Sequence, residues 1–249
     1  MLVLAPVWRA REEANVLALH NLFTHPEFTM SPPLFNDAAI DRARSRGATY
    51  FLEQTTADVA LWLDSDIDFK DEDALTICRQ AMDPKTSIVA GIYPTRSASA
   101  AIPASRMLRD YPYTFSNDPT PQPILWAAGG FVAIHRRVYE RIAKENPEMG
   151  VLHPNDRVLR MRPFYLPMAG KDEDGNPIYL SEDWAFCERA RLVGFPSYAN
   201  CAVDLVHIGT YRYSIRNLFS QPQIDRPIRF TRRADGNLVE RTNGSSDTR

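Results

Sequence analysis

Three aspartates stand one residue apart in the stretch LWLDSDIDF, where an apolar run comes to its end. Carboxylates this close repel each other and raise one another's pKa, so a cluster of them usually has a cation to neutralise it. Alternate residues of an extended chain point to the same side, so we expect Asp64 and Asp66 to converge on one metal ion. Asp68 and the acids after it suit the first turn of the following helix. Helix capping by all three aspartates is the alternative.

A second pair of acids, Glu182 and Asp183, follows Ser181 at the start of a predicted helix. An N-cap at Ser181 and the helix dipole are a complete structural explanation for acids at this place. A positioned carboxylate can also take a proton from a hydroxyl, which is the functional alternative for this pair. His207, in DLVHIG, reads by its surroundings as a core histidine, and a metal ligand is the alternative.

An alternation of strands and helices must position these residues. We expect strands over residues 2–7, 59–64 and 87–94, and helices over residues 11–23, 36–55 and 71–82, with Asn36 or Asp37 as an N-cap. This order predicts an α/β domain with a doubly wound sheet. Ligands of such sheets gather beyond the carboxyl ends of the strands, which is where Asp64 and Asp66 come.

The second half of the chain is less regular at its start. Residues 95–123 contain five prolines and are expected to form an irregular binding segment. A strand over 124–134, broken by Gly129 and Gly130, follows, and then a helix over 135–146. Two strands around the turn KDEDGN, a helix over 181–195 and a last core strand over 201–209 complete the domain. We expect one domain over residues 1–233 and a loosely ordered tail over 234–249.

Composition excludes several classes of protein. The 249 residues carry a formal net charge of −2, which favours neither bulk nucleic-acid nor membrane binding. The three cysteines fit neither a disulfide framework nor a zinc site and indicate a reducing compartment. The N-terminus does not have the pattern of a signal peptide, and no apolar run has the roughly 20 residues of a membrane span. We therefore expect a cytoplasmic protein without a membrane span.

Four segments, in order and spacing, resemble the GT-A fold of nucleotide-sugar glycosyltransferases. They are LWLDSDIDF as the D-x-D strand, AAGGFVAIHRRVYERI as the glycine segment and its helix, SEDWAFCERARLVGF as the E-D helix, and DLVHIGTYRY with the late histidine. The pattern is most similar to small enzymes of phages and large DNA viruses, and more distantly to the Anp1-like mannosyltransferases. The resemblance implies a mixed, mostly parallel sheet flanked by helices, and an enzyme acting in the host cell.

The resemblance also implies roles for the acids. A Mn²⁺ or Mg²⁺ ion would lie between the D-x-D and the diphosphate of a UDP-sugar or, less favoured, a GDP-sugar. Asp66 would bind it directly, Asp64 through water or by holding the ribose, and His207 would be the third ligand. In an inverting enzyme, which we expect, Asp183 rather than Glu182 would be the base that activates the acceptor hydroxyl.

Further residues are assigned to the substrates by their places in the pattern. Two would lie on the acceptor side: Tyr93 and Trp126. The donor would be bound by Pro6, Val7, Trp8, Arg44, Asp64, Ser65, Gly129, Gly130, Arg212 and Arg216. The acceptor itself stays open between a glycan, a protein and a modified DNA base. The arginines after residue 211 leave DNA possible, although the net charge does not favour it.

Three rival readings use the same residues differently. A haloacid-dehalogenase-type phosphatase also has D-x-D at a strand end, but it expects Thr or Val where this chain has Asp68. A sugar nucleotidyltransferase should open with a glycine-rich phosphate loop, and LAPVWRARE contains no glycine. A catalytically inactive sugar-nucleotide-binding protein is the non-enzyme alternative.

Overall fold

The structure is a computed structural model. It describes residues 1–7, 11–30, 39–97, 102–153, 156–209, 212–214, 230–234 and 237–239. For residues 152–153, 156–160, 212–213, 230–234 and 237–239 it describes the backbone alone.

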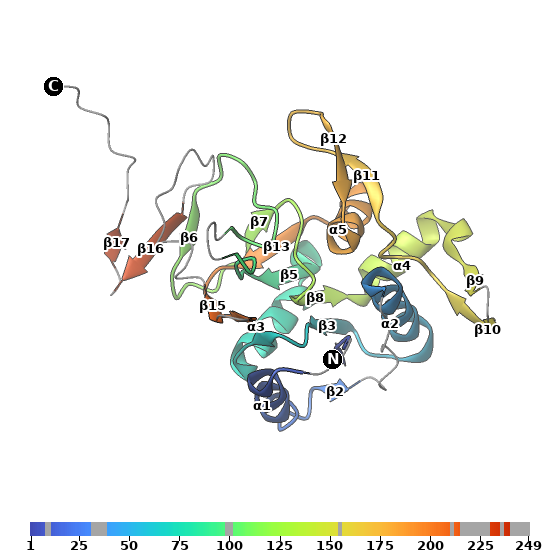
Figure 1. The fold of residues 1–249 in the computed structure, drawn as a ribbon, viewed down its shortest axis with the longest axis horizontal. Coiled ribbons are helices and arrows are strands. Elements are labelled where there is room, and N and C mark those ends of the chain that lie inside the picture. The colour runs from blue at the N-terminus through green and yellow to red at the C-terminus, as the bar shows by residue number, and fades with distance from the viewer. Residues whose placement is uncertain are drawn as a thin grey trace.

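A sheet of seven strands runs through the middle of the described chain (Figure 1). In spatial order its strands are β2 (Thr29–Met30), β1 (Leu2–Leu4), β3 (Val59–Leu63), β8 (Phe131–His135), β5 (Ile88–Gly91), β13 (Ser197–Asn200) and β7 (Gln122–Ile124). Strand β8 runs antiparallel to both β3 and β5, and β7 runs antiparallel to β13. The other five strands share one direction, which confirms the predicted mixed, mostly parallel sheet.

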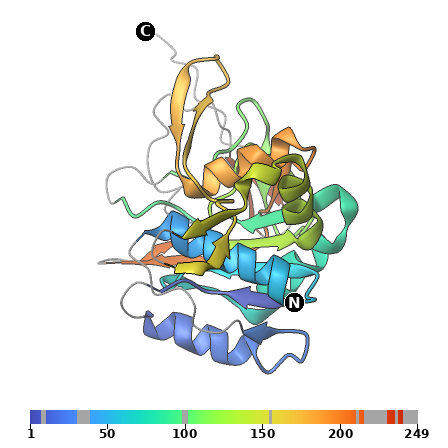
Figure 2. The same cartoon turned by 90° about the vertical axis from the view of Figure 1, so that its right-hand side faces the viewer.

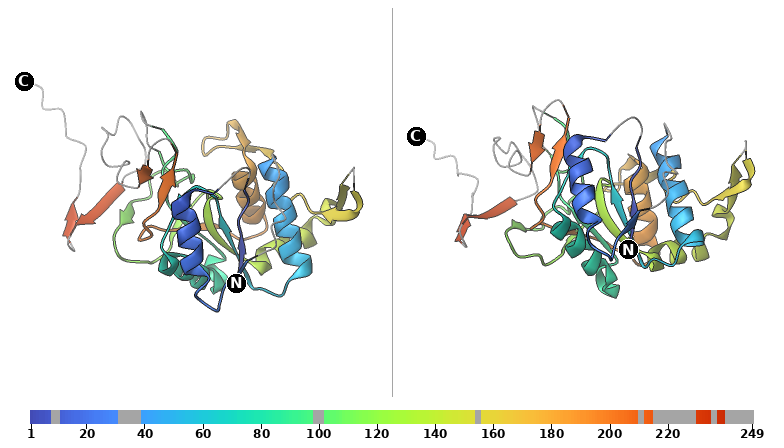
Figure 3. Two further views of the ribbon diagram at one scale, coloured as in Figure 1. Left: turned by 60° about the horizontal axis from the view of Figure 1, so that its bottom comes forward. Right: turned by 90° about the horizontal axis from the view of Figure 1, so that it is seen from below.

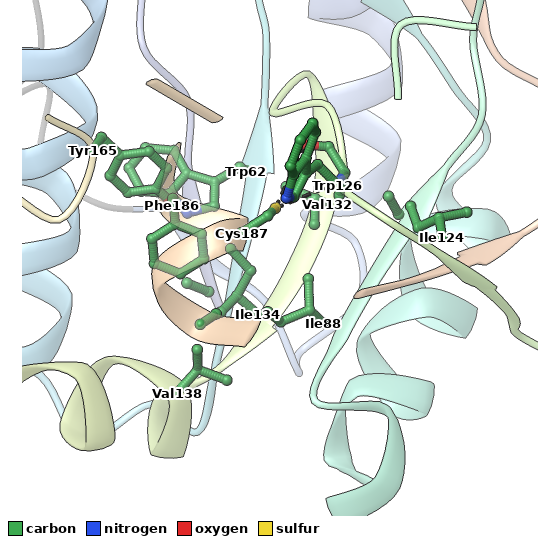
Figure 4. Close-up of a cluster of buried hydrophobic side chains, with 14 of the residues drawn as sticks. Trp62, Ile88, Ile124, Trp126, Val132, Ile134, Val138, Tyr165, Phe186 and Cys187 are labelled. Atoms are coloured by element: carbon green, nitrogen blue, oxygen red, sulfur yellow. Dashed lines mark hydrogen bonds between the residues drawn. The ribbon is translucent and has the colours of Figure 1, made fainter. Parts of the chain in front are cut away.

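Helices cover both faces of this sheet (Figure 3). Helices α1 (Glu13–Leu22) and α3 (Asp71–Met82) pack on one face, and α2 (Ile40–Gln54), α4 (Arg136–Glu145) and α5 (Glu182–Leu192) pack on the other. Strand β3 is apolar throughout because it is buried on both sides: Trp62 points to the second group of helices and Leu61 to the first. Figure 4 shows Trp62 in the core beneath α5, beside Phe186.

In the described part of the chain, four smaller sheets accompany the central one. Strand β14 (Val206–Ile208) pairs with β4 (Ile67–Asp68) and β15 (Arg212–Ser214). The hairpin of β11 (Met168–Lys171) and β12 (Pro177–Leu180) projects away from the domain (Figure 2). The remaining pairings join β9 (Val151–His153) to β10 (Asp156–Met161), and β16 (Phe230–Ala234) to β6 (Tyr113–Phe115) and β17 (Asn237–Val239).

Several predicted elements are confirmed. The helix over 71–82 has the predicted bounds, and the turn KDEDGN closes a hairpin in which Gly175 takes a φ of 83°. Such a positive φ suits glycine because it lacks a Cβ atom. No helix in the described ranges combines the length and apolar character needed to cross a membrane.

Other expectations are wrong in informative ways. The strand predicted over 124–134 is two strands, because β7 ends at Ile124 and β8 begins at Phe131, on different sides of β5 and β13. The strand predicted over 201–209 shortens to β14, which lies outside the central sheet, while β13 was missed. The irregular segment 95–123 includes β6 and the start of β7. Asn36 and Asp37 lie outside the described residues, as does the predicted tail apart from 234 and 237–239.

Candidate functional site at the end of the central sheet

Segments from the whole length of the chain meet beyond the carboxyl ends of β3 and β5. Asp64 follows β3, and Tyr93 follows β5. Because β8 runs antiparallel to both strands, Gly129 and Gly130 enter it at this same edge, and the Asp64 N–H donates to the Gly130 carbonyl (2.9 Å). Helix α5 points its N-terminus here, since the Gly129 N–H donates to Asp183 Oδ2 (3.2 Å).

A buried arginine stands at the centre of the first group of residues, the Arg44 cluster (Arg44, Asp64, Gly129 and Glu182). Arg44 lies on α2 and is 2% exposed. Its Nη2 donates to Asp64 Oδ1 (2.7 Å), its Nη1 donates to the Gly129 carbonyl (3.0 Å), and its Nε lies 3.5 Å from Glu182 Oε1. Burial alone lowers the pKa of Arg44, but the charges of Asp64 and Glu182 raise it above its ordinary value. The guanidinium therefore stays charged and holds both carboxylates in place.

Glu182 and Asp183 differ sharply in their surroundings. Burial, and the nearby charge of Asp183, raise the pKa of Glu182, and Arg44 offsets part of that rise. Asp183 Oδ1 accepts hydrogen bonds from the Ser181 hydroxyl (2.6 Å) and the Trp184 N–H (2.8 Å). Ser181 occupies the N-cap position, but its hydroxyl bonds Asp183 in place of a backbone N–H. Asp183 is thus fixed, with its Oδ2 directed at the glycine segment.

A second group, the Asp66 cluster (Asp66, Arg96 and His207), lies where β4 and β14 pair. The Ile208 N–H donates to the Asp66 carbonyl (2.8 Å), which places His207 beside Asp66. The distance from Asp66 Oδ2 to His207 Nε2 is 3.6 Å. Arg96 Nη2 makes an ion pair with Asp66 Oδ2, and Arg96 Nε donates to His207 Nε2 (3.0 Å). Burial raises the pKa of Asp66, but the neighbouring His207 and the charge of Arg96 outweigh it and lower the pKa.

The three aspartates do not alternate along one extended strand, so that expectation is wrong. Ser65 and Asp66 form a turn between β3 and β4, and the Asn15 side chain fixes this turn by donating to the carbonyls of Asp64 (3.0 Å) and Ile67 (2.7 Å). The carboxylates of Asp64 and Asp66 therefore pair with different arginines. Asp68 belongs to β4 and not to the first turn of α3.

Tyr93 connects the two clusters. Its hydroxyl accepts a hydrogen bond from the Gly130 N–H (2.9 Å), and its ring contacts the His207 ring edge to face, with centroids 5.2 Å apart. A Cβ atom on Gly130 would come within 2.4 Å of Tyr93 Oη, and one on Gly129 within 2.7 Å of Arg44 Cζ. Both glycines thus let the backbone pack against these side chains. The roles of the glycines in donor binding remain predictions.

The acidic and histidine side chains of this region fit the predicted metal ion only in part. Within the described ranges, no three His, Cys, Asp or Glu side chains converge as a metal-binding group. The pair of Asp66 and His207 fits a shared ion, because two ligand atoms roughly 2.1 Å from one metal stand about 3–4 Å apart. His207 Nδ1 lies 2.9 Å from the Pro94 carbonyl and must donate to it, so Nε2 carries a lone pair, which accepts the hydrogen bond of Arg96 Nε. Asp64, held by Arg44, is not part of this pair.

The other predicted site residues are divided between the surface, the core and the parts of the chain that are not described. Pro6 and Val7 follow β1, and the Ser65 carbonyl accepts from the Glu12 N–H (2.9 Å). Trp126 is buried; its Nε1 donates to Glu188 Oε2 (3.0 Å), so its ring supports the core (Figure 4). Three positions are not placed in full, since Trp8 and Arg216 lie outside the described residues and Arg212 is described by its backbone in β15.

Sequence reasoning missed three polar residues of this region. Asn15 is a buried amide on the apolar side of α1, a signal that could have been noticed. Arg11 donates to the Ala5 carbonyl (2.8 Å) and to Asn15 Oδ1 (3.0 Å), and burial lowers its pKa although Asp64 opposes this. Arg96 gave no signal, because it stands in the proline-rich segment without periodicity.

Comparisons with known proteins identify the fold. No protein-family model and no curated protein matches the sequence. Among solved structures, A197 from STIV, a virus, matches with a TM-score of 0.50 at 15% identity, over 84% of this chain and 85% of A197. GalNAc-T7, crystallised with UDP, GalNAc and Mn²⁺, matches with a TM-score of 0.41 at 12% identity, over 84% of this chain and 37% of that one. The chain therefore has an α/β fold of the GT-A type that resembles a small viral protein.

Proposed function

We propose that this protein is a metal-dependent glycosyltransferase that moves a sugar from a nucleotide-diphosphate sugar to a hydroxyl acceptor. One observation supports this most strongly: Asp66 Oδ2 and His207 Nε2 stand 3.6 Å apart, and Nε2 carries a lone pair because Nδ1 donates to the Pro94 carbonyl. They lie at the same sheet edge as Asp64 and Asp183. The likeness of fold to A197 is consistent with this proposal.

Asp66 and His207 would hold Mn²⁺ or Mg²⁺, with Mn²⁺ favoured because an imidazole is one of the ligands. When bound, such an ion stabilises the negative charge that grows on a departing diphosphate. Asp64 has a different task in this proposal. Its carboxylate is oriented by Arg44 and its backbone by Asn15, so it can accept a hydrogen bond from a ribose or sugar hydroxyl at a fixed place.

Asp183 is the proposed base for an inverting reaction. Ser181 and the Trp184 N–H occupy Oδ1, while Oδ2 has one weak partner, the Gly129 N–H at 3.2 Å. Oδ2 therefore keeps lone-pair capacity for the proton of an acceptor hydroxyl. Glu182 instead pairs with Arg44, the same arginine that binds Asp64, and so balances part of its positive charge.

The donor is proposed to be a UDP-sugar, with a GDP-sugar as the second choice, and the acceptor a hydroxyl of a glycan, a protein or a modified DNA base. Six further residues are proposed to contact the donor: Pro6, Val7, Trp8, Ser65, Arg212 and Arg216. The three cysteines are free and buried, which suits the cytoplasm.

The phosphatase alternative requires a free nucleophilic carboxylate. Asp64 Oδ1 instead accepts a charged hydrogen bond from the buried Arg44, which lowers its reactivity toward phosphorus. The inactive binding protein is distinguished by activity alone, since it would bind the same nucleotide and metal.

Thermal unfolding with UDP, GDP and their sugars, with and without Mn²⁺, tests the proposal. We expect UDP or UDP-sugars to raise the melting temperature only with metal, because a ligand at 100 times its Kd stabilises the native state by about 2.7 kcal/mol. Asp66→Asn should abolish the shift, while Asp174→Asn, which changes an exposed ion pair on the projecting hairpin, should keep it. No response to any nucleotide, or a phosphorylated Asp64, would contradict the proposal.

A further inference from the structure

The side chain of Arg96 lies between the two atoms that fit a metal ion. Its guanidinium bridges Asp66 Oδ2 and His207 Nε2, using the carboxylate oxygen and the ring lone pair that a cation would need. The side chain is nevertheless half exposed, whereas Asp66 and His207 are mostly covered. A soluble cation can therefore compete with Arg96 from the solvent side.

The backbone around Arg96 is held while its side chain reaches out. The Ala104 N–H donates to the Tyr93 carbonyl (2.9 Å), and the Thr95 N–H donates to the Ile102 carbonyl (2.8 Å). The Pro94 carbonyl also fixes the His207 ring. Arg96 thus departs from a fixed stem, and a change of its rotamers alone would free Asp66 and His207.

We propose that Arg96 is an exchangeable internal cation and a donor-binding residue of this site. Without metal it neutralises Asp66; when Asp66 and His207 bind a divalent ion, its guanidinium turns to the phosphate oxygens of the nucleotide. A planar guanidinium matches phosphate as well as carboxylate, so it exchanges one anion for another. This inference rests on the proposed function, because it takes the Asp66 and His207 pair as the metal site.

The exchange has a signature that a structural role would not produce. Removing the guanidinium should strengthen binding of the metal alone, about two- to fivefold, since an exposed ion pair of ordinary strength no longer competes. The same change should weaken UDP binding at saturating metal by about tenfold, because a charged hydrogen bond to phosphate is lost. The two effects have opposite signs.

The experiment compares the wild-type chain with Arg96→Gln. Arg79→Gln is the matched control, because Arg79 is an exposed arginine of α3 that pairs with Glu27. Free Mn²⁺ is titrated by electron paramagnetic resonance without nucleotide, and UDP is titrated calorimetrically at saturating Mn²⁺. We expect tighter Mn²⁺ and weaker UDP for Arg96→Gln, and wild-type values for Arg79→Gln.

Two results would overturn the inference while leaving the proposed function intact: Mn²⁺ affinity that is unchanged or lower in Arg96→Gln, or unchanged UDP affinity. If neither the wild type nor Arg96→Gln binds Mn²⁺, even with UDP, both the inference and the metal dependence of the proposed function fail.

Discussion

Asp64 and Asp66 are separated by one residue and each pairs with an arginine, but the two pairs differ in almost every other respect. Arg44 is 2% exposed and also contacts Gly129 and Glu182, so Asp64 is held by a buried arginine. The Arg96 side chain is 50% exposed and shares Asp66 with His207. The comparison shows that two acids of one D-x-D can have different surroundings: Asp64 is held by a buried arginine and Asp66 by an exposed one.

The largest expected difference lies in stability. Arg44→Gln removes a buried cation from the part-buried carboxylates of Asp64 and Glu182, so we expect the free energy of unfolding to fall by about 3–5 kcal/mol. Arg96→Gln breaks an exposed pair and should cost under about 1 kcal/mol. Urea unfolding monitored by tryptophan fluorescence measures both. Equal losses for the two variants would show that the division between the clusters is wrong.

The link between the clusters gives the next largest effect. Gly130→Ala places a methyl group too close to Tyr93 Oη and 2.9 Å from Tyr93 Cζ, so Tyr93 must shift and its contact with His207 changes. We expect a loss of about 1–3 kcal/mol, typical of overpacking. Chemical unfolding of Gly130→Ala beside Gly150→Ala checks this.

Gly150 is the matched control, because its nearest atom to an added Cβ is 3.8 Å away. Its substitution should leave the unfolding midpoint almost unchanged. A Gly130→Ala variant as stable as Gly150→Ala would mean that Tyr93 does not connect the clusters.

The smallest expected effects are opposite pH dependences of the two clusters. The pKa of Glu182 is raised in the native state, so between its ordinary value of 4.5 and the raised value the native state binds more protons than the unfolded state. That contribution is full below pH 4.5 and is lost as pH rises through the folded pKa. The pKa of Asp66 is lowered, so its contribution is full above 3.8 and is lost as pH falls through the folded pKa.

Unfolding free energies across about pH 2 to 8 for the wild type, Glu182→Gln and Asp66→Asn check this prediction. Glu182→Gln should gain stability relative to the wild type as pH rises above 4.5. Asp66→Asn should instead have a lower free energy of unfolding than the wild type above pH 3.8, and this difference should disappear as the pH falls below 3.8. Parallel curves for the wild type and both variants would contradict the assigned electrostatics.

The sequence predicted the fold well where local signals and burial agree. The apolar run of β3 and the acidic first turn of α3 predict their elements nearly to the residue, because a doubly buried strand and a dipole-matched helix leave strong patterns. The apolar run through Gly129 and Gly130 predicted one strand, but it contains the end of one strand and the start of another. Only tertiary pairing separates these cases.

For the site, residue types were easier to predict than partners. Asp66 and His207 could be proposed together as ligands from their places in the sequence, and they are 3.6 Å apart. The turn at Ser65 and Asp66 was hidden, because the Asn15 side chain that fixes it lies far away in the chain. Arg96 was hidden for the same reason: its contacts come from the pairing of β4 and β14 and not from its neighbours.

Asp66 and His207 are proposed to form the metal site of a nucleotide-sugar transferase. Electron paramagnetic resonance titration of Mn²⁺ in the presence of UDP tests it on the wild type, Asp66→Asn, His207→Gln and Asp174→Asn, each first shown to be folded. We predict that the wild type and Asp174→Asn bind Mn²⁺ alike, and that Asp66→Asn and His207→Gln bind it at least about tenfold more weakly. Mn²⁺ binding to both of these variants with wild-type affinity would contradict the claim.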